Sequence, residues 1–92
     1  MERPRRMMER LVDSAGLSGE AIPGLPLVEL SGDRRVLIEN HRGVTEYSRE
    51  RIGIRVRYGQ VLVCGCGLEL ARMSKEQLVI LGRIDGITLC RR

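Results

Sequence analysis

Apolar and polar residues alternate along much of the chain after Pro26, and such alternation predicts β-strands. The pattern is clearest over residues 52–58, where every second position is Ile, Val or Tyr. Side chains at every second position of a strand point to the same face of the sheet. This segment is therefore predicted to be a strand that buries one face and turns Arg55 and Arg57 toward water.

Two other runs, residues 61–64 and 78–81, are apolar at every position, which predicts strands covered on both faces. Gly59-Gln60 separates two predicted strands and has the composition of a two-residue hairpin turn. A polar turn is predicted at residues 74–76. Shorter strands are predicted at residues 27–30, 36–40, 44–47, 68–70 and 84–89.

Small or turn-forming residues interrupt the apolar runs at matching places. Asn40, Gly65 and Gly82 each follow one apolar run and precede another, in three similar units of strand, small residue and strand. Such residues let a strand kink or bulge and pass into a second layer. We therefore predict an all-β domain over residues 25–92, a small antiparallel β-sandwich or roll of six to eight short strands. The glycines assigned to turns or bends are Gly32, Gly43, Gly59, Gly65 and Gly82.

Residues 1–24 differ from the rest and are predicted to be a basic arm, either a short helix or a disordered segment. Apolar residues from Met8 to Ala15 recur at spacings of three and four, as on one face of a helix. The sequence Pro-Gly-Leu-Pro at 23–26 ends this segment. A basic amphipathic helix can dock on a partner or contact an anionic membrane, and both functions are considered. The basic residues assigned to this surface are Arg5, Arg6 and Arg10.

The charge of the chain leaves two interpretations open. The 92 residues include 16 Lys and Arg against 12 Asp and Glu, a net charge of +4. One interpretation is a small nucleic-acid-binding β-barrel, with Arg49, Arg51, Arg55 and Arg57 as its contact patch. Single-strand binders also stack bases on aromatic side chains, and this chain has no Phe, no Trp and only two Tyr. A solvated basic surface is therefore favoured.

The most distinctive stretch is Ile38-Glu-Asn-His-Arg-Gly43. It resembles the YabP/YqfC family of small sporulation proteins from endospore-forming Firmicutes, and the YqfC branch in particular. The similarity extends over residues 25–90 and includes the Gly-x-Val-Leu-Val-x-Gly run at 59–65 and the segment 79–84. The chain departs from the usual family pattern at Cys64 and Cys66.

The resemblance implies a protein made in the mother-cell compartment during sporulation and associated with spore cortex and coat formation. Family members tend to be encoded beside membrane proteins of the same programme. The expected partner is therefore a sporulation membrane protein at the forespore envelope, or further copies of the chain. No catalytic activity is attached to the family, so the chain is expected to be neither an enzyme nor a cofactor-binding protein. No apolar run approaches the about 20 residues of a membrane helix, and a cytoplasmic location is expected, with a peripheral position at the forespore membrane as the alternative.

The corner at residues 39–42 and the cysteines are the candidates for chemistry. A general base needs a positioned partner and a pocket, and the sequence near His41 offers no nucleophile. A structural role for His41 is therefore favoured over catalysis. If this corner has a function, we expect it to be an exposed surface that binds a partner. Structural zinc sites commonly use pairs of cysteines with two residues between them, whereas Cys64 and Cys66 have one residue between them, so no metal site is predicted. The residues assigned to the partner-binding corner are Glu39, Asn40, His41 and Arg42, and the cysteines are Cys64, Cys66 and Cys90.

Overall fold

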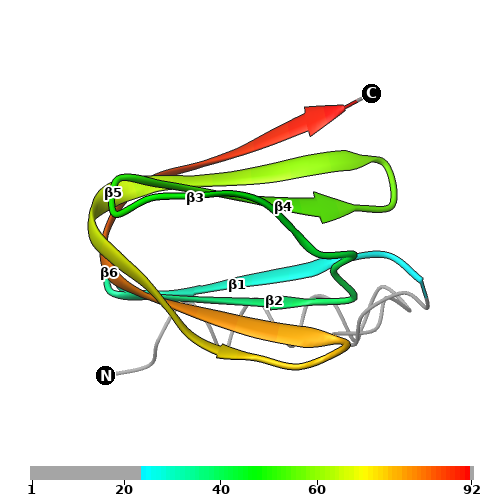
Figure 1. The fold of residues 1–92 in the computed structure, drawn as a ribbon, viewed down its shortest axis with the longest axis horizontal. Helices are drawn as coiled ribbons and strands as arrows, with labels where there is room; N and C mark the ends of the chain where they lie inside the picture. Colours follow the sequence, from blue (N-terminus) through cyan, green and yellow to red (C-terminus); the bar gives the residue numbers. More distant parts are fainter. Residues whose placement is uncertain (1–23, 92) are drawn as a thin grey trace, which may run out of the picture.

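The computed structural model of the protein describes residues 24–91, which form a single antiparallel sheet of six strands (Figure 1). The all-β prediction is confirmed. The strand order across the sheet is β1-β2-β6-β5-β4-β3. In chain order the strands are β1 (Leu27–Ser31), β2 (Arg35–Glu39), β3 (Val44–Tyr47), β4 (Arg51–Val56), β5 (Gly59–Met73) and β6 (Gln77–Arg91).

The sheet folds over on itself because two of its strands are long enough to belong to both layers. β5 and β6 have 15 residues each and pair with one another along their length. The first part of β5 pairs with β4, and the first part of β6 pairs with β2. Figure 1 shows both long strands curving at one side, so that β3 and β4 lie in the upper layer and β1 and β2 in the lower. The sequence predicted the bends but assigned a separate short strand to each side of them, whereas the structure continues one long strand through each bend.

The two long strands bend where they approach each other most closely. A Cβ atom at Gly65 would collide with the backbone carbonyl of Arg83, and one at Gly82 would lie 2.7 Å from the Gly67 carbonyl oxygen. Gly82 has a φ of 137°, which side chains disfavour. The pairing register shifts at Cys64/Gly65, as expected at a β-bulge. The predicted bends at Gly65 and Gly82 are thus confirmed, because only glycine permits this approach.

The β1–β2 turn holds the bend of β6. The backbone N–H of Gly82 donates to the carbonyl of Arg34 at 3.2 Å, and that of Ile84 donates to the carbonyl of Asp33 at 2.7 Å. These two carbonyls come from the turn that contains Gly32, whose φ of 59° confirms its predicted turn role. Amides next to the bend therefore find partners in a neighbouring turn.

The β3–β4 turn does the same for the bend of β5. The N–H of Gly65 donates to the carbonyl of Glu50 at 3.0 Å, and that of Leu68 donates to the carbonyl of Arg49 at 2.8 Å. The two halves of the sheet are thus built alike, each with a hairpin turn that holds the bend of one long strand. We call this side of the molecule the bend end, defined by turns 32–34 and 48–50 and by the bends at Gly65–Gly67 and Gly82.

The core lies between the two layers and is entirely aliphatic. Ile52, Ile54 and Val56 of β4 are buried, as the alternation predicted, and Gly53 on the opposite face is buried as well. The prediction that 61–64 and 78–81 are covered on both faces is confirmed for Leu78-Val79-Ile80, which are all buried, and is wrong for Leu62, which is half-buried, and for Leu81, which is 39% exposed. A sheet folded into two layers covers its inner faces most completely, and side chains on its outer faces are shielded only by their neighbours. The buried core residues are Val36, Ile38, Ile52, Ile54, Val56, Val61, Val63, Leu68, Leu78, Ile80 and Ile84.

The hairpin between β4 and β5 turns two residues earlier than predicted. Val56 pairs with Gly59, so Arg57 and Tyr58 form the turn and Gly59 begins β5. A side chain at Gly59 would collide with the carbonyl of Cys90 on β6. Glycine is therefore required at position 59 because β5 and β6 approach closely there, and not because of the turn.

The predicted arm, with its Arg5, Arg6 and Arg10, lies outside the described residues apart from Gly24. The part of the chain that the structure describes contains no helix long and apolar enough to cross a membrane.

Candidate functional site

The connection from β2 to β3, residues 40–43, carries the chain from the lower layer to the upper one. Asn40 begins it with a φ of 62°, a conformation that Asn tolerates better than most residues. The N–H of Asn40 donates to the carbonyl of Glu76 at 2.7 Å, and its side-chain Nδ2 donates to the carbonyl of Leu25 at 2.7 Å. Asn40 therefore ties the β5–β6 turn and the entry to β1 to this corner.

His41 is buried, with 8% of its surface exposed. The N–H of Gly43 donates to Nδ1 at 3.0 Å, and Nε2 lies 2.9 Å from the carbonyl oxygen of Ser74. Because Nδ1 accepts a hydrogen bond, the ring is neutral and carries its proton on Nε2, which donates to Ser74. The expectation of an exposed His41 is wrong, and the geometry supports its structural interpretation.

The other residues assigned to the corner are only partly accessible. Glu39 is half-buried and accepts a hydrogen bond from Gln77 Nε2 at 2.9 Å. Arg42 is exposed, and its backbone N–H donates to the carbonyl of Arg55 at 2.7 Å. Gly43 accepts the N–H of Arg55 at 2.8 Å and has a φ of 115°, as expected of a turn glycine. A partner-binding role for this corner stays a prediction, and Arg42 is its exposed member.

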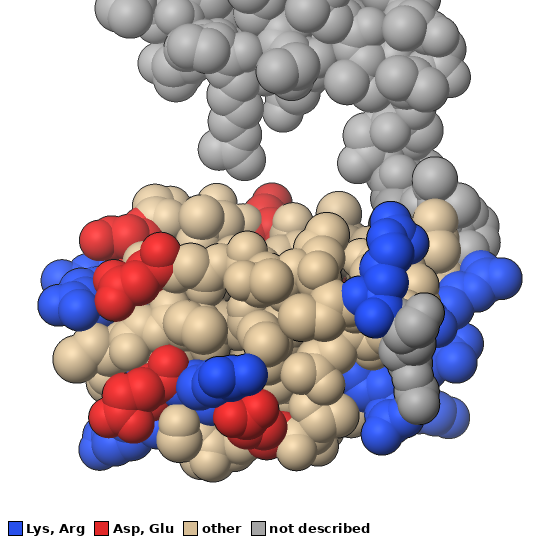
Figure 2. Space-filling view, turned by 90° about the horizontal axis from the view of Figure 1, so that it is seen from above, with Lys and Arg blue, Asp and Glu red and all other residues tan. Residues whose placement is uncertain are grey.

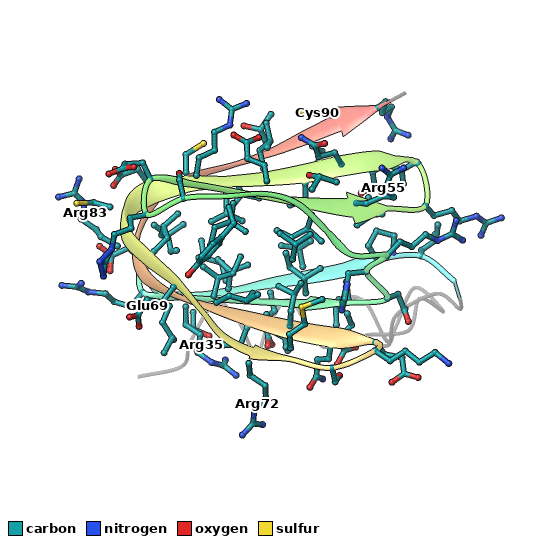
Figure 3. The ribbon with its side chains drawn as sticks, viewed as in Figure 1. Arg35, Arg55, Glu69, Arg72, Arg83 and Cys90 are labelled. Carbon is teal, nitrogen blue, oxygen red and sulfur yellow. The ribbon has the colours of Figure 1, made fainter. Side chains whose placement is uncertain are left out.

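Sheet pairing splits the basic patch that the sequence suggested. Arg51 and Arg55 stand at opposite ends of β4, about 13 Å apart at the rise of a strand. Arg51 Nε lies 3.1 Å from Glu46 Oε2 at the bend end, together with Arg49. Arg55 lies at the opposite side, beside the residue 40–43 connection (Figure 3). Arg49, Arg51, Arg55 and Arg57 therefore do not form one surface.

A different basic cluster forms at the side opposite the bends, which we call the corner end; it comprises the 40–43 connection and the 57–58 and 74–76 turns. Arg91 at the end of β6 pairs with Gly59 and places its guanidinium 5.0 Å from the centre of the Tyr58 ring. Figure 2 shows the right-hand side of the upper layer with basic side chains and no acidic ones in that view. We define the corner cluster as Arg42, Arg55, Arg57 and Arg91. Sequence inspection missed it because residues up to 49 positions apart meet there.

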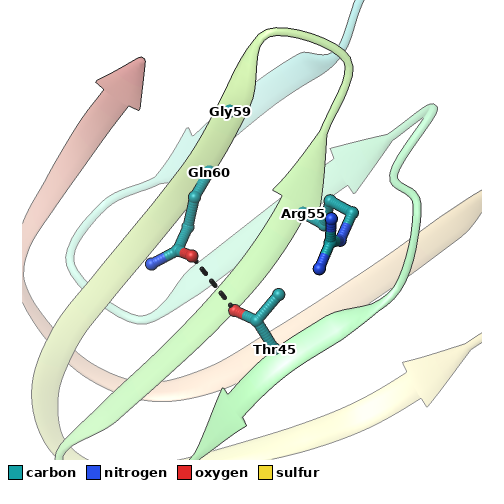
Figure 4. Close-up of a pocket in the computed structure, with 4 residues that line it drawn as sticks. All are labelled: Thr45, Arg55, Gly59 and Gln60. Atoms are coloured by element: carbon teal, nitrogen blue, oxygen red, sulfur yellow. Dashed lines mark hydrogen bonds between the residues drawn. The ribbon is translucent and has the colours of Figure 1, made fainter. Parts of the chain in front are cut away.

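Two shallow hollows open at the corner end. One, of about 240 Å³, is lined by Thr45, Arg55, Gly59 and Gln60 (Figure 4). Thr45 Oγ1 donates to Gln60 Oε1 at 3.4 Å, which leaves the Gln60 amide nitrogen and the Arg55 guanidinium as donors. The other, of similar volume, is lined by Gly24, Asn40, His41, Arg42, Lys75 and Glu76. Both hollows bring hydrogen-bond donors to the same end of the molecule.

Charges are paired at the bend end. Three ion pairs between described residues lie there: Arg34 with Asp33 at 3.9 Å, Arg51 with Glu46, and Arg83 with Asp85 at 3.1 Å. Arg83 makes two parallel hydrogen bonds to the Asp85 carboxylate, which raise the pKa of its guanidinium above the ordinary value. These exposed pairs add little to stability but neutralise the basic residues around them.

The cysteines are free thiols placed at separate points of the sheet. Cys64 pairs with Gly86 and Cys90 pairs with Gln60, while Cys66 is exposed at the bend. Within residues 24–91, no group of three or more His, Cys, Asp or Glu side chains is arranged to hold a metal ion.

These features define the chain as a small all-β protein whose single sheet folds into two layers. Its corner holds a buried histidine that is hydrogen-bonded through both ring nitrogens, and arginines gather at the same end of the molecule. The chain belongs to the YabP family, whose sequence model matches residues 26–92 and so includes all six strands. It is also similar to the uncharacterized protein YqfC of Bacillus subtilis (strain 168), with 25% identity over 84 residues that cover 91% of this chain and 90% of the relative. No solved structure matches the chain.

Proposed function

We propose that the protein is a non-enzymatic sporulation factor of the mother-cell cytoplasm that acts through protein–protein contacts in spore cortex and coat development. Its match to the YabP family over residues 26–92 carries this proposal. The partner we propose is a membrane protein of the forespore envelope or another copy of the chain.

Open strand edges with exposed apolar side chains support a role in protein contact. β1 and β3 are the outer strands of the sheet, and the parts of β5 and β6 that extend beyond β4 and β2 also have one free edge. Such edges offer unpaired backbone groups to another strand. Each of the four strands carries one large apolar residue that is at least half exposed: Leu30, Tyr47, Met73 and Leu89.

Leu89 offers the sharpest test of this proposal. It is 55% exposed on the free edge of β6, and its neighbour Thr88 points to the opposite face of the same strand. In sporulating cells that lack the native gene, we expect Leu89→Glu to lower the yield of heat-resistant spores. Thr88→Glu introduces the same charge next to it and should leave the yield unchanged.

Light scattering on the purified proteins distinguishes the two partners. If the partner is another copy, the wild type is larger than a monomer and Leu89→Glu is monomeric. If the partner is a membrane protein, both are monomers, and cross-linking in cells through a residue of the β6 edge joins the wild type to that membrane protein. Full spore yield with a folded Leu89→Glu variant would rule out this edge as the contact surface.

A further inference from the structure

We propose that the corner end is a binding face for the headgroups of anionic phospholipids, so that the molecule stands end-on against a membrane. This inference rests on the distribution of charge in the structure and does not depend on the proposed protein partner.

The corner cluster gathers arginines from four separate parts of the chain. Arg42 and Arg55 are joined by a backbone hydrogen bond of 2.7 Å between the 40–43 connection and β4. Arg57 lies in the turn that follows β4, and Arg91 ends β6 beside that turn, over the Tyr58 ring. The topology of the folded sheet brings all four to one blunt end of the molecule.

Positive charge is left in excess at this end but not at the other. The bend end interleaves Arg34, Arg49, Arg51 and Arg83 with the carboxylates of Asp33, Glu46, Glu50 and Asp85. None of the three ion pairs between described residues lies at the corner end. Its acids are Glu39, which accepts a hydrogen bond from Gln77, and Glu76, which follows Lys75. The field of the described domain therefore points its positive pole out of the corner end.

The donors at this end suit phosphate. Guanidinium groups bind phosphate oxygens through paired N–H donors. The hollow beside Arg55 presents that guanidinium and the Gln60 amide together, in a volume of about 240 Å³ that admits a phosphate group (Figure 4). Each basic residue close to an anionic bilayer strengthens binding about fivefold, so four arginines acting together form an effective contact.

The surroundings favour a membrane over a nucleic acid. Tyr58 is half-buried with Arg91 over its ring, and Tyr47 lies at the bend end, so described aromatic rings do not form a stacking platform for bases. The described chain also begins at the corner end, because Leu25 is held by Asn40 and Gly24 lies against Arg57.

The test compares two variants of the full chain with the same change of net charge. The corner variant carries Arg42→Gln, Arg55→Gln, Arg57→Gln and Arg91→Gln, and the control carries Arg34→Gln, Arg49→Gln, Arg51→Gln and Arg83→Gln. Binding to vesicles of mixed phosphatidylglycerol and phosphatidylcholine is measured by sedimentation, with phosphatidylcholine vesicles as the neutral surface. We expect the wild type to bind only the mixed vesicles, the control to bind within about twofold of it, and the corner variant to bind at least tenfold more weakly.

Several results would overturn the proposal. These are no binding of the wild type to mixed vesicles, equal losses in the two variants, tighter binding to single-stranded DNA than to vesicles, or release from vesicles by inorganic phosphate at low concentration. Equal losses would mean that net charge alone matters, and the last two results would assign the cluster to another anion. Circular dichroism checks that both variants fold. If the corner variant does not, the exposed single substitutions Arg42→Gln and Arg57→Gln replace it, each with an expected loss of about fivefold, and unchanged binding in both would reject the proposal.

Discussion

At the scale of single residues, the side chains of Asn40 and His41 fix the corner between β2 and β3 through hydrogen bonds to backbone carbonyls. Both side chains donate to carbonyls of segments distant in sequence, Leu25 and Ser74. The sequence supported a structural role for this stretch, since Asn favours positive φ and a nearby glycine completes a turn. It did not reveal the partners, because a separation of 33 residues between His41 and Ser74 leaves no local pattern.

The role of His41 predicts the effect of removing it. His41→Leu fills the space of the imidazole ring with an apolar side chain but leaves the Gly43 N–H and the Ser74 carbonyl without partners. We expect the free energy of unfolding to fall by about 1 kcal/mol, the lower end of the range for polar groups that lose their hydrogen bonds, because Gly43 is half-buried and Ser74 is exposed. Urea denaturation measures the change, with Arg42→Gln as the exposed neighbouring control, expected within about 0.5 kcal/mol of the wild type.

The protonation state of the ring provides a second readout of the same contact. The hydrogen-bond geometry requires a neutral His41 with its proton on Nε2. Nitrogen NMR shifts of the two ring positions near neutral pH should therefore report Nε2 as protonated and Nδ1 as an acceptor. A ring protonated on Nδ1 would contradict the hydrogen bond from Gly43.

At the scale of elements, the strands and their bends were predictable from the sequence, and the continuity of the long strands was not. Apolar runs that stop at Gly65 and Gly82 have the same appearance whether the chain breaks or only bends there. Which of these happens depends on hydrogen bonds from the distant turns at 32–34 and 48–50. The turn predicted at Gly59 is misplaced for a similar reason, because the glycine is needed where its backbone approaches the carbonyl of Cys90, 31 positions later in the chain.

Gly65 is expected to be the least replaceable of these glycines. A side chain there would meet the carbonyl of Arg83 in the backbone of β6, which cannot move without shifting the bend. Gly65→Ala should lower the free energy of unfolding by at least about 2 kcal/mol, in the range for overpacking. Gly86→Ala is the matched control, because a Cβ at Gly86 meets nothing within 4 Å. Thermal unfolding of the two variants tests this, and equal midpoints would refute the close approach.

At the scale of the whole molecule, the two layers cannot be separated, since β5 and β6 form part of each. The sequence predicted a sandwich with bends but not that a single sheet would supply both halves. Charge is divided between the two ends of the molecule. The bend end pairs its arginines with acids, whereas the corner end collects arginines from distant segments. The sequence suggested Arg55 and Arg57 as basic contact residues but grouped them with Arg49 and Arg51. The length of β4 places that second pair at the bend end.

Shared strands predict cooperative unfolding. Because β5 and β6 belong to both layers, neither layer can unfold without removing strands from the other. Urea should therefore unfold the protein in one transition. Native-state hydrogen exchange should give the same opening free energy for buried amides of the lower layer, such as Val36, and of the upper layer, such as Ile54. Two separate transitions, or clearly different values for these amides, would show that the layers are independent.

The hairpin turns of the bend end have a consequence for how the protein tolerates inserted sequence. Turns 32–34 and 48–50 must keep their length, because carbonyls at fixed positions in them reach the amides of the bent strands. The Arg57-Tyr58 turn carries no such contact among the backbone hydrogen bonds of the described residues. A peptide epitope or affinity tag grafted into the 57–58 hairpin should therefore leave the domain intact, whereas the same graft at either of the other two turns should prevent it from forming.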